Sequence, residues 1–532
     1  MKRLCSSLAL LSVATPLSFV TAAETATAGD VRKQPNIVFI LTDDHAWQAI
    51  SAYGDERKLI STPHIDRLAR EGMRFDRCLV TNALCGPSRA SILTGTYSHI
   101  NGFVNNSNCR FDSSQPTFPK LLHAAGYQTA MIGKWHLETD PTGFDFWQIV
   151  PGQGIYYNPP MIRNGEPVAT TGYVTDVITD VSIDWLQRRD KTKPFMLLSW
   201  QKAPHRSWEP ALRDLDFDGG RQYAEPPTLF DDYSGRGPAV REQDMTIRHT
   251  LNEADLKLVP VKSMTDEQRR VWDDYYGPRN AAFQAANLQG DDFVRWKYQR
   301  YMHDYLACVR GVDDNVGRLL AYLGREGLLE NTIIVYSSDQ GFFLGEHGWF
   351  DKRWAFEESL RTPLIVRWPE VIKPGSINKD IVSTVDFAET FLDAAQVPVP
   401  ARMQGRSLLP LFKGERPADW RTSYYYSYYE YPAFHRVQPH EVVVTDRYKL
   451  VHFFGKGNDY WELYDNAVDP REMSDVHGKM GYGDVQGQLG QELKRLRMEL
   501  KVPAPIPSEW FGIDTQYPAH LKMPAPVEPR AP

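Results

Sequence analysis

The chain has 532 residues and a formal net charge of −7, with 42% hydrophobic and 24% charged residues. This composition is typical of a globular protein, and the length exceeds one ordinary hydrophobic core, which favours two domains. The negative net charge argues against nucleic acid as the main partner. It also means that local positive charge must hold any anionic substrate.

The N-terminus has the features of a secretory signal. Lys2 and Arg3 precede a short apolar run, and small residues near Ala23 offer a cleavage site. We therefore expect residues 1–23 to be a signal peptide and the protein to be secreted or periplasmic. Pro16 interrupts the run, which is too short for a membrane span, and no other stretch reaches that length.

Few cysteines remain once the expected signal is removed. They are Cys78, Cys85, Cys109 and Cys308. Such a small number does not make a disulfide framework, and the sequence leaves the pairing of these cysteines open.

Apolar runs alternate with amphipathic stretches over most of the chain. Strands are predicted at 36–44, 128–136, 194–205 and 331–341, and helices at 62–72, 85–95, 117–127, 174–189 and 313–329. Because the strands alternate with helices, the sequence predicts an α/β fold with a mostly parallel sheet covered on both faces.

Two later parts of the chain depart from this pattern. Residues 207–292 lose the periodicity and are rich in Pro, Gly and Asp, which indicates a long insertion in a catalytic domain of residues 34–418. Antiparallel strands and a closing helix are expected in a C-terminal subdomain of residues 419–502. Residues 503–532 form a Pro-rich tail.

Polar side chains follow each predicted strand of the first domain. In open α/β sheets ligands bind beyond the carboxyl ends of the strands, so we expect these side chains to meet at one site. The set is Asp43, Asp44, Lys134, His136, Lys202, His205, Asp339 and Gln340.

Part of this set could bind a cation. Asp43, Asp44, Asp339 and Gln340 offer only oxygen ligands, and no Cys or His pair stands at zinc spacing. Oxygen ligands suit Ca²⁺ or Mg²⁺. An isolated acidic pair is more often a cap or a turn, so the hypothesis depends on both pairs ending strands.

The remaining members, with Arg89 and Lys352, could hold an anion. Arginine can grip an oxyanion with two parallel hydrogen bonds, whereas lysine acts as a point charge. His136 and His205 are candidates for proton transfer. For each residue alone, a surface or structural role is the ordinary alternative.

Cys85 lies in the segment TNALCGPSRASILTG. Pro and Ser suit a first helical turn, so Cys85 should stand at a helix N-terminus, where backbone N–H groups favour negative charge. The thiol could be buried and inert, or it could be a reactive centre facing an anion.

This segment resembles the Cys-x-Pro-Ser-Arg signature of the type I sulfatases in the alkaline phosphatase superfamily. Similar segments follow in that family's order: NIVFILTDD, GKWH, QKAPH, SDQGFFLGEHGWFDKRWAFEESLRTPLIV and ELYDNAVDP. The resemblance covers residues 35–477. It implies a large mixed, mostly parallel sheet sandwiched by helices, with a smaller C-terminal α+β subdomain on an antiparallel sheet.

The resemblance also implies a modified nucleophile. A formylglycine-generating maturation enzyme would oxidise Cys85 to formylglycine (3-oxoalanine), and a hydroxyl of its hydrate would attack sulfur. Asp43, Asp44, Asp339 and Gln340 would bind one Ca²⁺ that also touches residue 85, with Mg²⁺ as an alternative.

The other roles follow from the same resemblance. Arg89 would support the hydroxyl, while Lys134, Lys352 and His205 would hold the sulfate group. His205 or Lys352 would protonate the leaving alcohol, and His136 would help the second hydroxyl to expel sulfate. Lys202 and Gln340 depart slightly from the family pattern, which leaves a substrate contact by Lys202 less defined.

The C-terminal segments EYPAFHRVQPH and TDRYKLVHF are similar to bacterial relatives of N-acetylglucosamine-6-sulfatase that act on sulfated glycans. A sulfated carbohydrate substrate is therefore expected. Candidate glycan contacts are His99, Asn105, Asn106, His435, Arg436 and His440. For each of them, domain packing is the alternative role. The aromatic run YYYSYYEY could stack on sugar rings, or its side chains could be buried in strands.

Two other functions remain open at this point. One is hydrolysis of phosphonate or phosphate esters by an enzyme of the same superfamily. The other is non-catalytic binding of sulfated glycans by a protein that is never matured. The segments GKWH and QKAPH favour sulfate, and the retention of every proposed catalytic group favours an enzyme.

Overall fold

The computed structural model describes residues 34–455 and 459–512. The expected signal peptide and the tail beyond residue 512 lie outside the described residues. Gln34 begins the unit that holds all the described residues. None of the helices in the described part of the chain has the length and apolar character needed to cross a bilayer.

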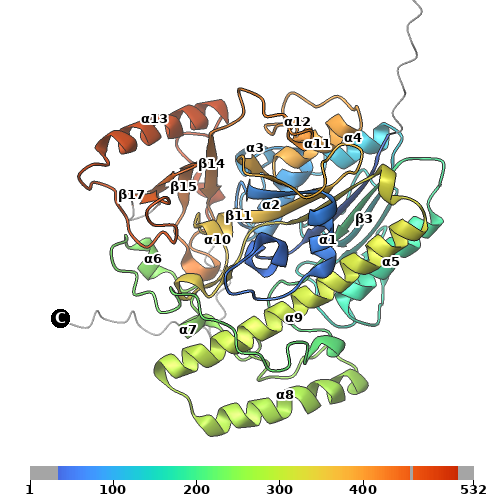
Figure 1. Cartoon of the computed structure of the whole chain (residues 1–532), viewed down its shortest axis with the longest axis horizontal. Coiled ribbons are helices and arrows are strands. Elements are labelled where there is room, and N and C mark those ends of the chain that lie inside the picture. The colour runs from blue at the N-terminus through green and yellow to red at the C-terminus, as the bar shows by residue number, and fades with distance from the viewer. Residues whose placement is uncertain (1–33, 456–458, 513–532) are drawn as a thin grey trace, which may run out of the picture. The chain divides into compact units, whose positions relative to one another are not determined.

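A mixed sheet of eleven strands lies at the centre of this unit (Figure 1). Its strands are β1 (Asn36–Thr42), β2 (Met73–Leu79), β3 (Gln128–Lys134), β4 (Phe146–Val150), β5 (Met161–Arg163), β6 (Glu166–Val168), β7 (Phe195–Trp200), β8 (Thr332–Ser338), β11 (Arg361–Arg367), β12 (Ser376–Asn378) and β13 (Val382–Ser383). The order is β12-β2-β11-β8-β1-β7-β3-β4-β5-β6, and β13 pairs with β2.

The middle of the sheet is parallel, as predicted. Strands β8, β1, β7, β3 and β4 are all parallel neighbours. By contrast, β11 runs antiparallel to both β2 and β8. Strands β2 and β11 were not predicted, because charged residues within MRFDRCL and RTPLIVR obscure their apolar pattern.

Helices cover both faces of the sheet, and β1 contributes alternate side chains to the two cores. Val38 and Ile40 belong to one core, whereas Ile37, Phe39 and Leu41 belong to the other. The first core includes residues of α1 (Pro63–Glu71), α5 (Val174–Arg188) and α9 (Gly290–Arg325), and the second those of α2 (Cys85–Thr94), α4 (Phe118–Ala124) and α11 (Asp386–Ala394). Burial on both faces explains why residues 37–41 of β1 are all apolar.

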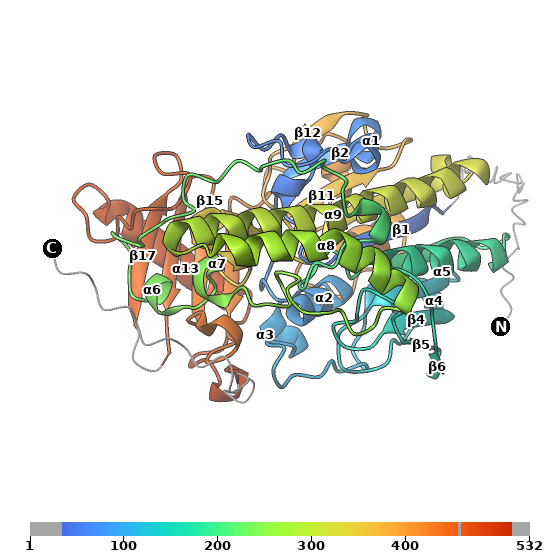
Figure 2. The same ribbon diagram turned by 90° about the horizontal axis from the view of Figure 1, so that it is seen from below.

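The expected insertion is more helical than its sequence indicates. It contains α6 (Ala239–Glu242), α7 (Ile247–Thr250) and the 21-residue helix α8 (Asp266–Ala286), which begins with a Thr265–Gln268 capping box. In Figure 2, α8 lies alongside α9. The pattern was hard to recognise because only Trp272 and Tyr276 of α8 are buried.

The C-terminal sheet is antiparallel, as predicted. It consists of β14 (Ser423–Tyr428), β15 (His440–Thr445), β16 (Tyr448–Phe453) and β17 (Tyr460–Asp465), with α13 (Gly483–Glu499) packed against it. The tyrosines of β14 are buried in a core shared with Leu84 and Trp354. These aromatic rings therefore hold the two sheets together and are not exposed for sugar stacking.

The remaining elements are short. They are α3 (Ser98–Asn101), α10 (Glu357–Leu360), α12 (Leu409–Phe412) and the strand pair β9 (Phe343–Leu344) and β10 (Phe350–Asp351). Cys78, Cys85, Cys109 and Cys308 are all free thiols in this structure.

Candidate active site

The polar ends of the parallel strands meet at one edge of the sheet. Thr42 and Ser338 are partners in the register of β1 and β8, so Asp43 and Asp339 leave the sheet side by side. The Asp339 N–H donates to the Thr42 carbonyl at 3.1 Å, and the Asp44 N–H donates to Asp339 Oδ1 at 3.2 Å. The expected convergence of strand ends is therefore observed.

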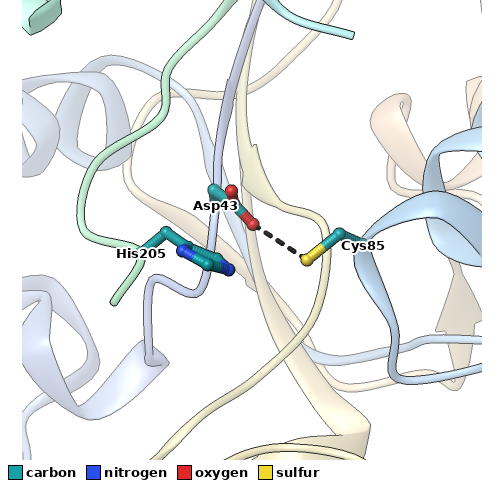
Figure 3. Close-up of side chains that lie close together, drawn as sticks. All are labelled: Asp43, Cys85 and His205. Atoms are coloured by element: carbon teal, nitrogen blue, oxygen red, sulfur yellow. Dashed lines mark hydrogen bonds between the residues drawn. The ribbon is translucent and has the colours of Figure 1, made fainter. Parts of the chain in front are cut away.

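Cys85 is the first residue of α2 and points at this edge. Its Sγ lies 3.2 Å from Asp43 Oδ1 (Figure 3) and 3.4 Å from Lys352 Nζ. Burial, followed by the Asp43 carboxylate, raises the pKa of the Cys85 thiol well above its usual range. The unmodified side chain is therefore a neutral thiol and a poor nucleophile.

Three buried carboxylates lie together beside Cys85. Oxygens of Asp43, Asp44 and Asp339 all fall within 4.8 Å of one another. Burial raises the pKa of Asp44 to about 6, and burial with the charge of Asp43 raises the pKa of Asp339 to about 8. Burial acts on Asp43 too, but the charges around it, that of Lys134 above all, hold its pKa well below the usual range. Such a group of acids is stabilised when positive charge lies among them.

The donor set at this point fits a hard cation. Gln340 Nε2 donates to Asp44 Oδ1, while Gln340 Oε1 is buried without a hydrogen-bond partner among the described residues. An orphaned amide oxygen beside carboxylates is unfavourable unless it has a positive ligand. Carboxylate and amide oxygens are the ligands that Ca²⁺ and Mg²⁺ prefer.

Arg89 is buried beneath the carboxylates. Its Nε and Nη2 donate to Asp339 Oδ2 at 3.0 and 2.9 Å, and its Nη1 donates to the Lys134 carbonyl at 2.6 Å. The guanidinium also lies 5.3 Å from the centre of the Trp200 ring. It therefore positions two strand ends and does not line the cavity described below.

The charges of two lysines act on Cys85. Lys352 Nζ donates to Asp44 Oδ1 at 2.7 Å and to Oδ2 at 2.8 Å. Burial would lower the pKa of Lys352, but the Asp44 carboxylate raises it well above the usual range, so the side chain stays charged. Lys134 Nζ contacts Asp43 Oδ2 and donates to Gln153 Oε1 at 2.5 Å.

Both candidate histidines reach the site. His205 Nδ1 donates to the Arg206 carbonyl at 2.6 Å, which leaves Nε2 free of hydrogen and 3.7 Å from Asp44 Oδ2. Figure 3 shows the His205 ring close to Asp43, on the opposite side from Cys85. Burial and then the charge of Lys134 lower the pKa of both His136 and His205 well below the usual value. Both rings are therefore neutral at pH 7.

Lys202 lies behind this group. Its ammonium sits 4.6 Å from the centre of the Tyr156 ring and 3.4 Å from the Arg206 carbonyl. Burial lowers the pKa of Lys202 to about 8. The structure thus brings Lys202 to the loop that carries His205 but not to the cavity lining.

A cavity of about 740 Å³ opens above the site. Asp44, Cys85, His136, His205 and Lys352 contribute to its lining. The volume is in the range of small-ligand pockets. Titratable side chains predicted from three separate strand ends, together with Cys85 and Lys352, therefore face one common space.

Of the predicted glycan contacts, Asn106 lines this cavity. The side chains of His99 and Asn105 bond to the carbonyls of Leu500 and Trp510 at 2.9 and 3.0 Å, and His440 stacks on Trp354. His435 is buried between Asp244 and Asp351, whereas Arg436 is exposed. The structure therefore does not bring His99, Asn105, His435, Arg436 or His440 to the cavity lining.

Other lining residues were not predicted. They include Glu138, Gln153, Arg206, Asp255, Asp351, Arg353, Glu430 and Phe434. Arg353 could have been noticed because it follows Lys352. Asp351, Arg206 and Glu138 could have been noticed for the same reason, because they lie beside Lys352, His205 and His136 in the sequence. Gln153, Asp255, Glu430 and Phe434 have no sequence pattern that relates them to a predicted strand end.

Comparisons with known proteins agree with this geometry. The family described as Sulfatase matches residues 35–397, and the one described as N-sulphoglucosamine sulphohydrolase, C-terminal, matches residues 345–499. N-acetylglucosamine-6-O-sulfatase of Bacteroides thetaiotaomicron is 52% identical over 490 residues, covering 88% of this chain and 87% of that protein. Human N-acetylglucosamine-6-sulfatase is 31% identical, covering 73% of this chain and 66% of that protein.

Solved structures extend the comparison. One, described as a complex with its substrate D-glucosamine-2-N,6-O-disulfate, is 51% identical with a TM-score of 0.87, covering 89% of this chain and 99% of that chain. A phosphonate monoester hydrolase from Silicibacter pomeroyi has a TM-score of 0.67 but is 22% identical, covering 87% of this chain and 95% of that chain. The second likeness shows only a shared fold.

Proposed function

Because the chain belongs to the sulfatase family and hydrolyses sulfate esters, we propose that its substrate is 6-O-sulfated N-acetylglucosamine or a related sulfated glucosamine of a glycan. The observation that carries this proposal is the similarity, over most of both chains, to the Bacteroides N-acetylglucosamine-6-O-sulfatase. The cavity above Cys85 supports it, because its volume of about 740 Å³ can accommodate a sugar unit.

We propose that residue 85 acts as formylglycine, made from Cys85 by a maturation enzyme, and that a hydroxyl of its hydrate is the nucleophile. The neutral, buried thiol supports this role, since it is unsuited to attack as a thiolate. Lys352 Nζ and Asp43 Oδ1 lie within 3.4 Å of Sγ, close enough to orient an oxygen in its place.

A Ca²⁺ ion, or alternatively Mg²⁺, held by Asp43, Asp44, Asp339 and Gln340 would stabilise negative charge next to residue 85. Arg89 would lower the pKa of Asp339 and hold its carboxylate in place through two hydrogen bonds to one oxygen. These assignments rest on the grouped carboxylates and on the orphaned Gln340 oxygen.

The remaining groups would bind the sulfate ester and move protons. Lys352 and Lys134 supply positive charge near Cys85, where an anion would lie. Lys352 is charged and can donate a proton to the leaving alcohol, while the unprotonated His205 Nε2 can hydrogen-bond the ester group. His136, neutral and with Nδ1 unpaired among the described residues, can accept a proton from residue 85.

We also propose that the protein is exported, on the basis of the signal-like residues 1–23. Export would place the enzyme in the periplasm or outside the cell, where sulfated polysaccharides are degraded.

A regioisomer screen tests the substrate proposal. Matured enzyme, verified by the mass of the peptide containing residue 85, should release sulfate fastest from N-acetylglucosamine-6-sulfate and from glycans that contain it. The 3- and 4-sulfated isomers and an aryl phosphate are the comparison substrates. Preference for another isomer would contradict the 6-O assignment, and a faster reaction with the phosphate ester would favour the phosphatase alternative.

A further inference from the structure

The loop after β4 approaches the active site beside Lys134. Lys134 and Val150 are register partners in β3 and β4, so the chain leaves β4 next to the Lys134 side chain. The following turn closes with a hydrogen bond of 2.9 Å from the Gly154 N–H to the Pro151 carbonyl. Gly154 has φ +68°, and a Cβ there would lie 2.9 Å from Val150 Cγ2. The turn therefore needs glycine at 154, and it carries Gln153 to the site.

Gln153 covers the ammonium group of Lys134. Lys134 is fully buried, and its Nζ bonds to Asp43 and to Gln153 Oε1, the latter at 2.5 Å. An ammonium can only donate hydrogen bonds, so the Gln153 amide must present its oxygen to Lys134. Its NH₂ group therefore faces away from Lys134. Within residues 34–455 and 459–512, Gln153 Nε2 has no hydrogen-bond partner, and the exposed side chain lines the cavity.

We propose that Gln153 both positions Lys134 and binds the substrate. Its Oε1 directs the Lys134 ammonium toward residue 85, and its Nε2 donates to an oxygen of the bound sulfate ester. This inference rests on the proposed function of the same site, because it needs an anionic ester above Cys85.

The neutrality of the side chain is part of the argument. A glutamine oxygen can hold the ammonium without cancelling its charge, so the charge remains available to the anion. A carboxylate at the same place would pair with Lys134 and would repel the sulfate group beside it. Glutamine also supplies a donor on the cavity side, which glutamate lacks at neutral pH.

Gln153→Ala and Gln153→Glu test the proposal, with Gln284→Ala and Gln284→Glu as matched controls. Gln284 is an exposed residue of α8 outside the cavity lining. The assay measures kcat and KM for a sulfated glucosamine, the inhibition constant of inorganic sulfate, and Tm. Loss of hydrogen bonds to charged groups should lower kcat/KM of Gln153→Ala at least tenfold and weaken sulfate inhibition, with an unchanged Tm.

Gln153→Glu should have a kcat/KM about tenfold below that of Gln153→Ala, and inorganic sulfate should inhibit it about tenfold more weakly. Both Gln284 variants should match the wild type. Wild-type kinetics of Gln153→Ala would overturn the proposal, as would equal effects of the Ala and Glu substitutions. If the wild type hydrolyses a different sulfate ester, only the substrate assignment fails, and the same variants are measured with that ester.

Discussion

Arg89 offers the sharpest test of how the carboxylate group is held. Replacement by methionine keeps the volume of the side chain but removes the guanidinium from Asp339 and the donor from the Lys134 carbonyl. All three side chains are fully buried. Above pH 8, where Asp339 with its pKa of about 8 is ionised, the variant therefore leaves a buried charge without its partner, in contrast to the loss of an exposed ion pair.

The magnitude follows from this burial. Breaking a buried, hydrogen-bonded ion pair by removing one partner costs about 3–5 kcal/mol. For a chain of roughly 500 residues the entropy of unfolding is about 1 kcal/mol/K, so Tm of Arg89→Met should fall by about 3–5 °C. The fall in Tm should be larger in chelator than with Ca²⁺, because the ion supplies positive charge to the same carboxylates. Sulfate release should be lost.

Arg89→Lys separates charge from geometry. Lysine keeps the charge but cannot make the three hydrogen bonds of the guanidinium, so the Tm loss should be smaller while kcat still falls about a hundredfold. Arg213 provides the control, since it makes two hydrogen bonds to Asp176 but its side chain is 45% exposed. Differential scanning calorimetry should give Arg213→Met a loss of at most about 1 °C. An active Arg89→Met enzyme of normal Tm, or an equal loss in Arg213→Met, would refute the reasoning.

Three further outcomes are expected. Cys85→Ser should retain the wild-type Tm but lose turnover, because the serine side chain lacks the second hydroxyl that would expel sulfate. Sustained sulfate release by this variant would contradict the formylglycine assignment. Chelation should abolish activity and lower Tm, and added Ca²⁺ should restore both, since a ligand of the native state stabilises it; activity that survives exhaustive metal removal would argue against a cation at Asp43, Asp44 and Asp339. Lys352→Met should lower kcat by about a thousandfold, as expected for loss of a preorganised charge at the reacting group. Steady-state sulfate release is the measurement, and a change confined to KM would assign Lys352 to binding alone.

The parallel strands and their polar ends could be predicted because both depend on local sequence. An apolar run such as NIVFILT must be buried on both faces, and the first polar residues after it must leave the sheet. Parallel strands place these ends on one edge, so Asp43, Lys134, His205 and Asp339 could be grouped before their distances were known. The family signature around Cys85 marked this residue as the candidate nucleophile.

The helix α8 and the glycan contacts were harder to predict for one reason. Both depend on which segments meet in space, and periodicity reports only that a face is buried or exposed. His99 and His440 look like binding residues in the sequence, but the His99 ring packs against Tyr425 of β14 and bonds to the Leu500 carbonyl, and the His440 ring stacks on Trp354. Nothing local distinguishes them from Asn106, which reaches the cavity.

The sequence by itself determined the α/β class, the parallel strand ends and the chemistry of the residues placed there, because these properties follow from hydrophobic pattern and side-chain type. Only the tertiary structure decided the walls of the cavity, where Gln153, Asp255 and Arg353 come from loops far apart in the chain. Loops carry no repeating pattern, and their positions depend on long-range packing. For that reason a candidate reacting group could be named from the sequence, whereas the surface of the cavity above it could not be predicted.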